Sequence, residues 1–299
     1  MVVLNRIKNK KYKGIAYIIG SAFFFALMNM FVRMSGDLPS VQKSFFRNFV
    51  AFFFALVVLL RSKEGFSFNK KNLPVFIGRA AFGTIGILCN FYAVDHLLLS
   101  DASILNKLSP FFAIIFSFFI LKERIKPIQA TAVAIAFCGA LLVVKPGFAL
   151  MDAFIPSLIG VAGGMCAGLA YTLVRVLGQR GERGPFIVLF FSAFSCIVTL
   201  PWLIFDFHPM TGAQVITLLL AGLSAAGGQF TITAAYTHAP AREVSVFDYT
   251  QIVFAAALGF MFFDQIPDIF SVIGYCMISG VAIMMFLYNK RKDAISQGS

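Results

Sequence analysis

Long apolar runs follow one another along the whole chain, and they restrict its fold more than any other feature. Each run is close to the length of about 20 residues that an α-helix needs to cross the hydrocarbon core of a bilayer. Ten such runs can be placed, at residues 14–34, 44–60, 73–94, 101–121, 127–145, 155–175, 185–204, 213–235, 244–263 and 267–288. Only short connections separate them, so a functional site has to be built inside a helix bundle or at its ends.

The low content of charged residues supports the same fold. Only 13% of the residues are charged and 59% are hydrophobic, whereas soluble domains carry roughly 25% charged residues. We therefore predict an all-α polytopic membrane protein of ten transmembrane helices, in contact with the lipid bilayer. The basic N-terminal segment resembles the start of a signal peptide, but the apolar run at 14–34 is too long for one. We interpret it as a retained first span.

The formal net charge of +12 raises the question of nucleic-acid binding, which needs a basic patch or stripe. Lys and Arg occur instead in short clusters at both ends of the chain and in every second connection. The remaining connections hold only Lys43 and Lys145, beside several aspartates. Such an excess of Lys and Arg is typical of cytoplasmic loops. We expect both termini in the cytoplasm, insertion into the cell membrane, and no nucleic-acid partner.

The second half of the chain repeats the first at an offset of about 142–145 residues. The clearest matches pair Leu27, Val32 and Arg33 with Leu169, Val174 and Arg175, Asn29 with Tyr171, and Gly78, Gly83 and Tyr92 with Gly222, Gly227 and Tyr236. Five spans per half is an odd number, so the halves, 13–145 and 155–288, would lie in opposite orientations. Inverted repeats of this kind underlie alternating access, with a substrate site between them near the midplane.

Several short motifs lie at corresponding places in the two halves. The first half has Arg47, the pair Ser109–Pro110 and the run FILKER at 119–124, and the second has FDYTQ at 247–251 and FFDQIPD at 262–268. With these motifs and the two repeats, the chain resembles EamA-type permeases of the drug/metabolite transporter superfamily over essentially its whole length. One departure is Gln265, which stands where the family pattern has a Glu, with Asp264 beside it as a substitute.

That resemblance implies a fold and a class of cargo. Ten helices would surround a central cavity lined mainly by spans one, three, four, six, eight and nine. The cargo would be amino acids, nucleotide-related metabolites or other small organic solutes, often exported.

Four ionisable residues lie within the predicted spans: Arg47, Arg79, Lys107 and Asp248. Each costs roughly 2.5–3.5 kcal/mol on insertion scales, so each is a functional candidate. Lys107 lies one turn before Pro110, which removes a backbone hydrogen bond and can kink the helix. Lys107 could contact an anionic group of the cargo, pair with Asp248, or extend to the outer surface. The sequence leaves these interpretations open.

The other ionisable residues allow several roles as well. Asp248, which shares a helix face with Gln251, is the candidate for proton coupling. Arg79 lies early in its span and could extend to the cytoplasmic surface or face the cavity. Arg47 lies near the outer end of span two, where it could bond to carbonyl groups, close an outer gate or contact the substrate.

Neutral polar and aromatic side chains complete the predicted substrate site: Asn29, Tyr92, Asn106, Tyr171, Gln229, Gln251, Tyr236 and Tyr249. Cavities for small organic solutes are mostly apolar with a few placed polar groups, so this set suits a metabolite of amino-acid size. Any of these side chains could instead serve hydrogen bonds between helices. A stripe formed by Gly160, Gly164 and Gly168 allows close packing inside the bundle or at the interface of a homodimer.

We therefore predict a secondary transporter of small organic solutes, with a preference for anionic cargo and a proton gradient or exchange as the energy source. No cofactor or metal is expected, because the five cysteines lack ligand spacing and the chain has no Walker A motif. The alternative is a membrane-embedded lipid-modifying enzyme, which would need a cluster of His, Asp or Glu at one membrane depth.

Overall fold

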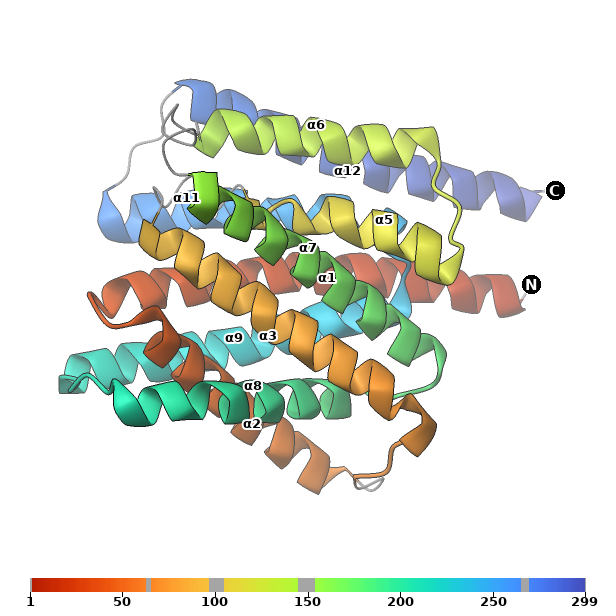
Figure 1. Cartoon of the computed structure of the whole chain (residues 1–299). Coiled ribbons are helices and arrows are strands. Elements are labelled where there is room, and N and C mark those ends of the chain that lie inside the picture. The colour runs from red at the N-terminus through yellow and green to blue at the C-terminus, as the bar shows by residue number, and fades with distance from the viewer. Residues whose placement is uncertain (1, 63–65, 97–104, 145–153, 265–268, 299) are drawn as a thin grey trace.

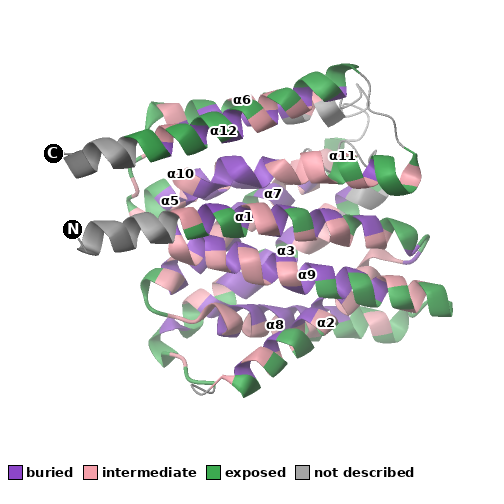
Figure 2. Cartoon of the chain, turned by 180° about the vertical axis from the view of Figure 1, so that it is seen from behind, coloured by how far each residue is buried: buried purple, intermediate pink, exposed green. Residues whose placement is uncertain are grey.

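The computed structural model describes residues 2–62, 66–96, 105–144, 154–264 and 269–298, and within these ranges all regular secondary structure is helical. In chain order the helices are α1 (Val2–Met34), α2 (Ser40–Arg61), the short 3₁₀ helix η1 (Lys70–Asn72), α3 (Leu73–His96), α5 (Ser109–Leu121), α6 (Pro127–Val144), α7 (Phe154–Gln179), α8 (Gly184–Phe205), α9 (Gly212–His238), α10 (Ala241–Val244), the 3₁₀ helix η3 (Ser245–Tyr249), α11 (Thr250–Phe263) and α12 (Ile269–Gly298). They form a bundle in which α3 and α7 lie toward the viewer in Figure 1, whereas α1 lies toward the viewer in Figure 2, which shows the opposite side.

Eight segments of the described chain are long and apolar enough to cross a membrane, and α5 and α6 are shorter apolar helices. Large apolar side chains cover the outside of the bundle, among them Ile197, Phe205 and Met261, which are 70%, 89% and 71% exposed. Figure 2 shows that such exposed positions follow the outward faces of the helices, while buried positions line the interior. The chain is therefore a polytopic membrane protein, because only a hydrocarbon solvent suits a surface of this kind.

The helices pack in pairs that join the first half of the chain to the second. α1 packs along α9, and α3 packs along α7. α2 lies against α8 at one edge of the bundle, and α6 lies against α12 at the opposite edge (Figure 1). α5 contacts α7, and α11 contacts α1. Each half therefore depends on the other for much of its buried surface.

Two predicted spans are interrupted. The segment 244–263 does not form one α-helix, because it passes through α10 and the 3₁₀ turns of η3 before α11 begins at Thr250. In the predicted span 101–121, α5 begins only at Ser109, after a turn at 107–108, and residues 101–104 lie outside the described residues. Pro110 lies in the first turn of α5, where a proline costs nothing because that N–H has no partner within the helix. Residues 105–106 are helical before the turn at 107–108, so the helix is interrupted next to the proline, which lies at the start of its second part.

The two interrupted spans end alike. α5 ends at Lys122 with φ 53°, and α11 ends at Asp264 with φ 50°. Both residues have the left-handed backbone conformation, which is uncommon outside glycine and which Asp tolerates better than most residues. Their offset of 142 positions matches that of the sequence repeat. The helix starts at Ser109 and Thr250 differ by a similar interval.

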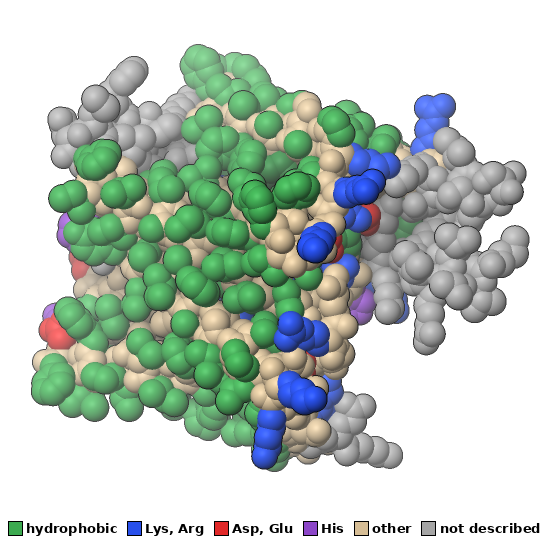
Figure 3. Space-filling view, turned by 45° about the vertical axis from the view of Figure 1, so that its right-hand side comes forward, with side chains coloured by type: hydrophobic (Ala, Val, Ile, Leu, Met, Phe, Trp, Pro, Cys, Tyr) green, Lys and Arg blue, Asp and Glu red, His purple; other side chains and the backbone are tan. Residues whose placement is uncertain are grey.

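The terminal segments are also helical, which the sequence interpretation did not include. α1 begins at Val2, well before the predicted span start at residue 14, and α12 continues beyond residue 288 to Gly298. The start of α1 and the end of α12 lie at the same end of the bundle (Figure 1). We call this the terminal end. On the face seen in Figure 3, Lys and Arg side chains gather toward the same end, and hydrophobic side chains cover most of the remainder.

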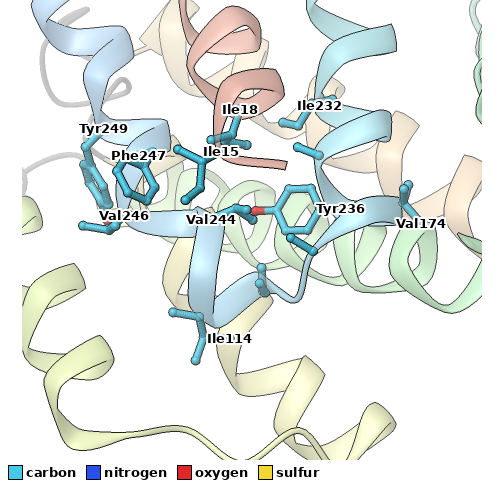
Figure 4. Close-up of a cluster of buried hydrophobic side chains, with 14 of the residues drawn as sticks. Ile15, Ile18, Ile114, Val174, Ile232, Tyr236, Val244, Val246, Phe247 and Tyr249 are labelled. Carbon is cyan, nitrogen blue, oxygen red and sulfur yellow. The ribbon is translucent and has the colours of Figure 1, made fainter. Parts of the chain in front are cut away.

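A buried apolar cluster fills the bundle near the terminal end. Its labelled members in Figure 4 are Ile15, Ile18, Ile114, Val174, Ile232, Tyr236, Val244, Val246, Phe247 and Tyr249. They come from α1, α5, α7, α9 and the segment α10–η3, which passes through the middle of the cluster (Figure 4). The irregular backbone of η3 is therefore enclosed by protein, as it must be at membrane depth.

The glycine stripe of α7 packs inside this chain. A Cβ placed on Gly160, Gly164 or Gly168 would lie 2.7 Å or less from an atom of α5 or of Leu105, which precedes α5. At Gly168 the nearest atom is the Cβ of Phe112, at 2.6 Å. The missing side chains thus allow α7 and α5 to approach closely, and the stripe is occupied by this contact.

Candidate functional site

A cavity of about 620 Å³ lies between the two halves of the chain. Its walls come from α1, α2, α3, α7, α8, α9 and α11, together with η3, the start of α5 and the residues just before α5. It reaches Gly36 and Asp37 in the α1–α2 connection and Phe263 at the end of α11, which lie at the end of the bundle away from the termini. The apolar cluster of Figure 4 closes the other end. Its volume falls in the usual range for small-molecule sites.

The lining is unusually rich in charge for a space inside a membrane bundle. Its charged members are Arg33, Asp37, Lys43, Arg47, Arg79, Lys107 and Asp248. Five of these are basic and two are acidic, so the lining has a formal excess of three positive charges. Charges within a membrane bundle are costly and mark solute pathways.

Lys107 and Asp248 meet at the level of the two helix interruptions. The Lys107 ammonium lies 3.3 Å from Asp248 Oδ2 and donates a 2.6 Å hydrogen bond to Gln251 Oε1. Tyr249 Oη donates to the backbone carbonyl of Lys107 over 2.8 Å. The pairing alternative for Lys107 is thus realised. Lys107 also lines the cavity together with its two partners, so pairing and exposure to the cavity occur together.

The interruptions explain why these side chains converge. Lys107 occupies the turn before α5, and Asp248 lies in η3 just before α11. Neither residue is inside a regular α-helix, so their backbones can approach the cavity more closely than a continuous helix would allow. This matches broken helices in transporters, where non-helical backbone lines a solute site.

Arg79 does not extend to the surface. Its side chain is 2% exposed and its guanidinium carbon lies 3.9 Å from the centre of the Phe191 ring. Nε and Nη1 of Arg79 have no hydrogen-bond partner among the described residues. Of the two alternatives for Arg79, the one in which it faces the cavity is therefore realised. The Phe191 ring stabilises the buried guanidinium group, which also borders the cavity.

Arg47 approaches the same cavity from α2. It is 9% exposed, its guanidinium lies 5.8 Å from the centre of the Phe25 ring, and its Nε has no partner among the residues that the structure describes. Arg79 and Tyr171 line the same cavity as Arg47. Two buried guanidinium groups and a phenol therefore border one cavity.

Most of the neutral residues predicted for the site also line the cavity. These are Asn29, Asn106, Tyr171, Gln229 and Gln251. Tyr171 stacks on Tyr236 with ring centres 5.0 Å apart. Tyr92 is not part of the lining: it is 38% exposed and stacks on His96 at 4.0 Å. Its place on α3, beyond the last lining residue, Asn90, explains the difference.

Several residues that line the cavity were not predicted from the sequence. Asn90, Ser109, Phe25 and Phe191 line the cavity, and α2 and α8 contribute to it although the resemblance implied a cavity formed mainly by other spans. One signal for Asn90 was available, since it lies one helical turn beyond Gly86 on the face of α3 that carries Gly83. No comparable pattern marks the two phenylalanines among the 37 of the chain.

Ion pairs and hydrogen bonds hold the terminal end together. Arg175 Nε lies 3.3 Å from Glu123 Oε1, and its Nη1 donates to the Thr237 carbonyl over 3.2 Å. Nearby, Glu182 accepts from the Asn72 side chain at 2.5 Å. These contacts link α7 to the connection after α5 and to α9, and they link the connection after α7 to η1. They lie at the end of the bundle where the cavity is closed.

The family of the chain follows from a comparison with known proteins. The family model of the EamA-like transporters matches residues 12–145 and again residues 155–287. The chain belongs to the EamA-like transporter family. The two matches together span nearly all of the chain, so the EamA-like sequence accounts for all the helices that form the cavity.

Relatives of this EamA-like protein are transporters by name. The pseudopaline exporter CntI of Pseudomonas aeruginosa is 32% identical over 267 residues, which cover 89% of this chain and 93% of the relative. Human solute carrier family 35 member G1 is 27% identical over 89% of this chain and 77% of its own. The EamA-like protein is thus a multi-pass membrane transporter.

A solved crystal structure supports the fold. It superposes with a TM-score of 0.81 over 93% of this chain and 98% of the other, at 16% sequence identity. At that identity the likeness shows a shared fold alone.

Proposed function

We propose that the chain is a secondary transporter of small organic anions that works by alternating access. The observation that carries the proposal is the cavity of about 620 Å³, which lies between the two halves, is closed at one end and has more basic than acidic residues in its lining. A solute enclosed there would meet a positive potential that water screens poorly. Anionic solutes would bind best.

The two halves are proposed to be inverted five-helix repeats, 13–145 and 155–288, which together form ten spans. In this scheme the turn before α5 completes span four, α6 is span five, and α10, η3 and α11 form span nine. The packing supports the scheme, in which α1 corresponds to α7, α3 to α9 and α5 to α11. If each helix is replaced by its counterpart, the α1–α9 contact becomes the α7–α3 contact, and the α5–α7 contact becomes the α11–α1 contact. The pairs α2–α8 and α6–α12 exchange with themselves.

Corresponding residues of the halves have different surroundings, which supports alternating access. Val32 lines the open cavity, whereas its counterpart Val174 is 1% exposed in the apolar cluster. Arg33 lies 4.8 Å over the Phe263 ring at the open end, whereas Arg175 is ion-paired with Glu123 at the closed end. A related state with the two environments exchanged would open the cavity to the other side.

The orientation belongs to the same proposal. The Lys and Arg content of the terminal end favours a cytoplasmic location for both termini, in the cell membrane. The cavity would then open outward, with the cytoplasmic end closed. We propose export as the direction, on the analogy of the relative named pseudopaline exporter.

Asp248 is the proposed site of proton coupling. Its side chain is 7% exposed beside the cavity and pairs with Lys107. Protonation of Asp248 would remove the negative charge that compensates the ammonium. The uncompensated ammonium would raise the positive potential of the cavity around an anionic cargo, so binding of cargo and of protons would be linked.

Counterflow in proteoliposomes tests the proposed function. Vesicles with purified full-length protein are preloaded with one member of a set of organic acids and their uncharged amides, and uptake of the labelled compound is followed. We expect faster exchange than in protein-free vesicles for one or more acids, and little for the matching amide. Exchange of amides at the same rate would contradict the anion preference. Absence of exchange together with a new lipid product would favour the membrane-embedded enzyme.

A further inference from the structure

The cations of the cavity fall into two groups that differ in how far their charges are already compensated. The Lys107 ammonium has a carboxylate at 3.3 Å and an amide oxygen at 2.6 Å. Its charge and its hydrogen-bonding capacity are therefore largely used within the protein. Arg47 and Arg79 have no ion pair with any residue that the structure describes, although both are at least nine-tenths buried.

Hydrogen bonding distinguishes these arginines further. Nε of Arg47 and both Nε and Nη1 of Arg79 have no partner in the described part of the chain. A buried charged donor without a partner costs more than a neutral one, and native proteins leave few such groups unpaired without a functional reason. Both residues line the cavity, so a bound solute could supply the missing acceptors.

Aromatic rings hold the two guanidinium groups in place. The Phe191 ring lies under Arg79 at 3.9 Å, and the Phe25 ring lies near Arg47 at 5.8 Å. A cation over a ring face is stabilised without using its N–H groups. The N–H donors in the plane of the guanidinium therefore stay available, and the side chains are oriented before any ligand arrives.

We propose that Arg47 and Arg79 form the subsite for the anionic oxygens of the cargo, a carboxylate or a phosphate group, apart from the Lys107–Asp248 pair. The inference rests on the proposed transport function and deepens it, because it names the part of the cargo that is recognised. Guanidinium groups match the planar oxygens of a carboxylate and the oxygens of a phosphate better than an ammonium does. In this arrangement Lys107 compensates the charge of Asp248, and the two arginines bind the anion.

Binding measurements on purified full-length protein test the subsite. Thermal stabilisation is titrated with three probes: succinate, inorganic phosphate and the uncharged succinamide, at constant ionic strength. The variants are Arg47→Gln and Arg79→Gln, with Arg61→Gln as the matched control, because Arg61 also lies on α2 but is exposed at its end and outside the cavity. The comparison of succinate with phosphate tells the two anionic groups apart.

The expected result is stabilisation of wild-type protein by succinate or phosphate and none by succinamide. Each cavity variant should weaken anion binding about 10- to 100-fold, the loss of a charge-assisted hydrogen bond, while Arg61→Gln keeps wild-type affinity. Arg47→Lys and Arg79→Lys keep the charge and should recover only part of the affinity. They also keep the test decisive if a glutamine variant does not fold.

Three results would overturn the subsite. One is anion binding of wild-type strength in both glutamine variants, and another is full affinity in both lysine variants. A third is wild-type protein that binds neither anionic probe. The transport function would survive any of these if vesicles still exchanged a neutral solute by counterflow, so failure of the subsite and failure of the function give different results.

Discussion

At the scale of single residues, the buried charges show what sequence reasoning could reach and what it could not. Ionisable residues inside apolar runs are visible in the sequence, and all four candidates line one cavity. The pairing of Lys107 with Asp248 was one of three alternatives that the sequence left open. The surroundings of Arg79 were not predictable, because its position over Phe191 depends on how α3 meets α8, and no local pattern encodes that contact.

The Lys107–Asp248 pair should behave as one unit in stability measurements. Lys107→Met alone and Asp248→Asn alone each leave a partner without compensation, which costs up to about 3–5 kcal/mol for a buried pair. The double variant removes both groups and should lose less than the sum of the single losses. Apparent unfolding temperatures of the four proteins in detergent check this. Additive losses would show that the two side chains do not stabilise each other.

Asp248 also carries the prediction on proton coupling. Wild-type exchange in proteoliposomes should respond to an imposed pH gradient, because protonation of Asp248 changes the charge beside the cargo. Asp248→Asn cannot bind or release the proton, so its exchange should become insensitive to the gradient. The proposal on Asp248 fails if the variant keeps the wild-type response, measured with the same cargo at matched protein content.

At the scale of helices, the position of each span was easier to predict than whether the span forms one continuous helix. Apolar runs of about 20 residues identified the positions of the spans, but not the 3₁₀ turns at Ser245–Tyr249. That segment contains neither Gly nor Pro, the usual signals of a break. Its irregular backbone is stabilised by tertiary contacts, such as the Tyr249 hydroxyl bonded to the carbonyl of Lys107. The break is therefore a property of the assembled bundle.

The contact between α7 and α5 gives a prediction at this scale. A Cβ at Gly168 would lie 2.6 Å from the Cβ of Phe112 and 2.8 Å from two backbone atoms. Gly168→Ala should thus destabilise the protein by about 1–3 kcal/mol through overpacking.

Gly280 of α12 is the matched control, because a Cβ there would meet no atom within 4 Å. Gly280→Ala should be neutral or slightly stabilising, since alanine is the better helix former by roughly 1 kcal/mol. Thermal unfolding in detergent compares the two variants. Equal stabilities would mean that α7 and α5 are not in close contact.

At the scale of the whole molecule, the sequence repeat and the asymmetry of the structure belong together. The family model matches both halves, yet the surroundings of corresponding residues differ at the two ends of the bundle. A single sequence predicts the repeat but not which end is open, because two states of similar packing differ little in the contacts that the sequence pattern specifies. The ion pair of Arg175 with Glu123 marks the end that is closed here.

The pair Val32 and Val174 tests alternating access most directly. Each is replaced by cysteine in a variant without the five native cysteines, all of which are free thiols. A maleimide that cannot cross membranes is then applied to right-side-out and to inverted vesicles. Val32→Cys should react from the face opposite the termini, and Val174→Cys should react only from the face of the termini. Conditions that drive transport should raise the labelling of one position as the labelling of the other falls. Labelling that rises at both positions under the same conditions, or a Val174→Cys that stays unreactive under every condition that supports transport, would contradict alternating access around this cavity.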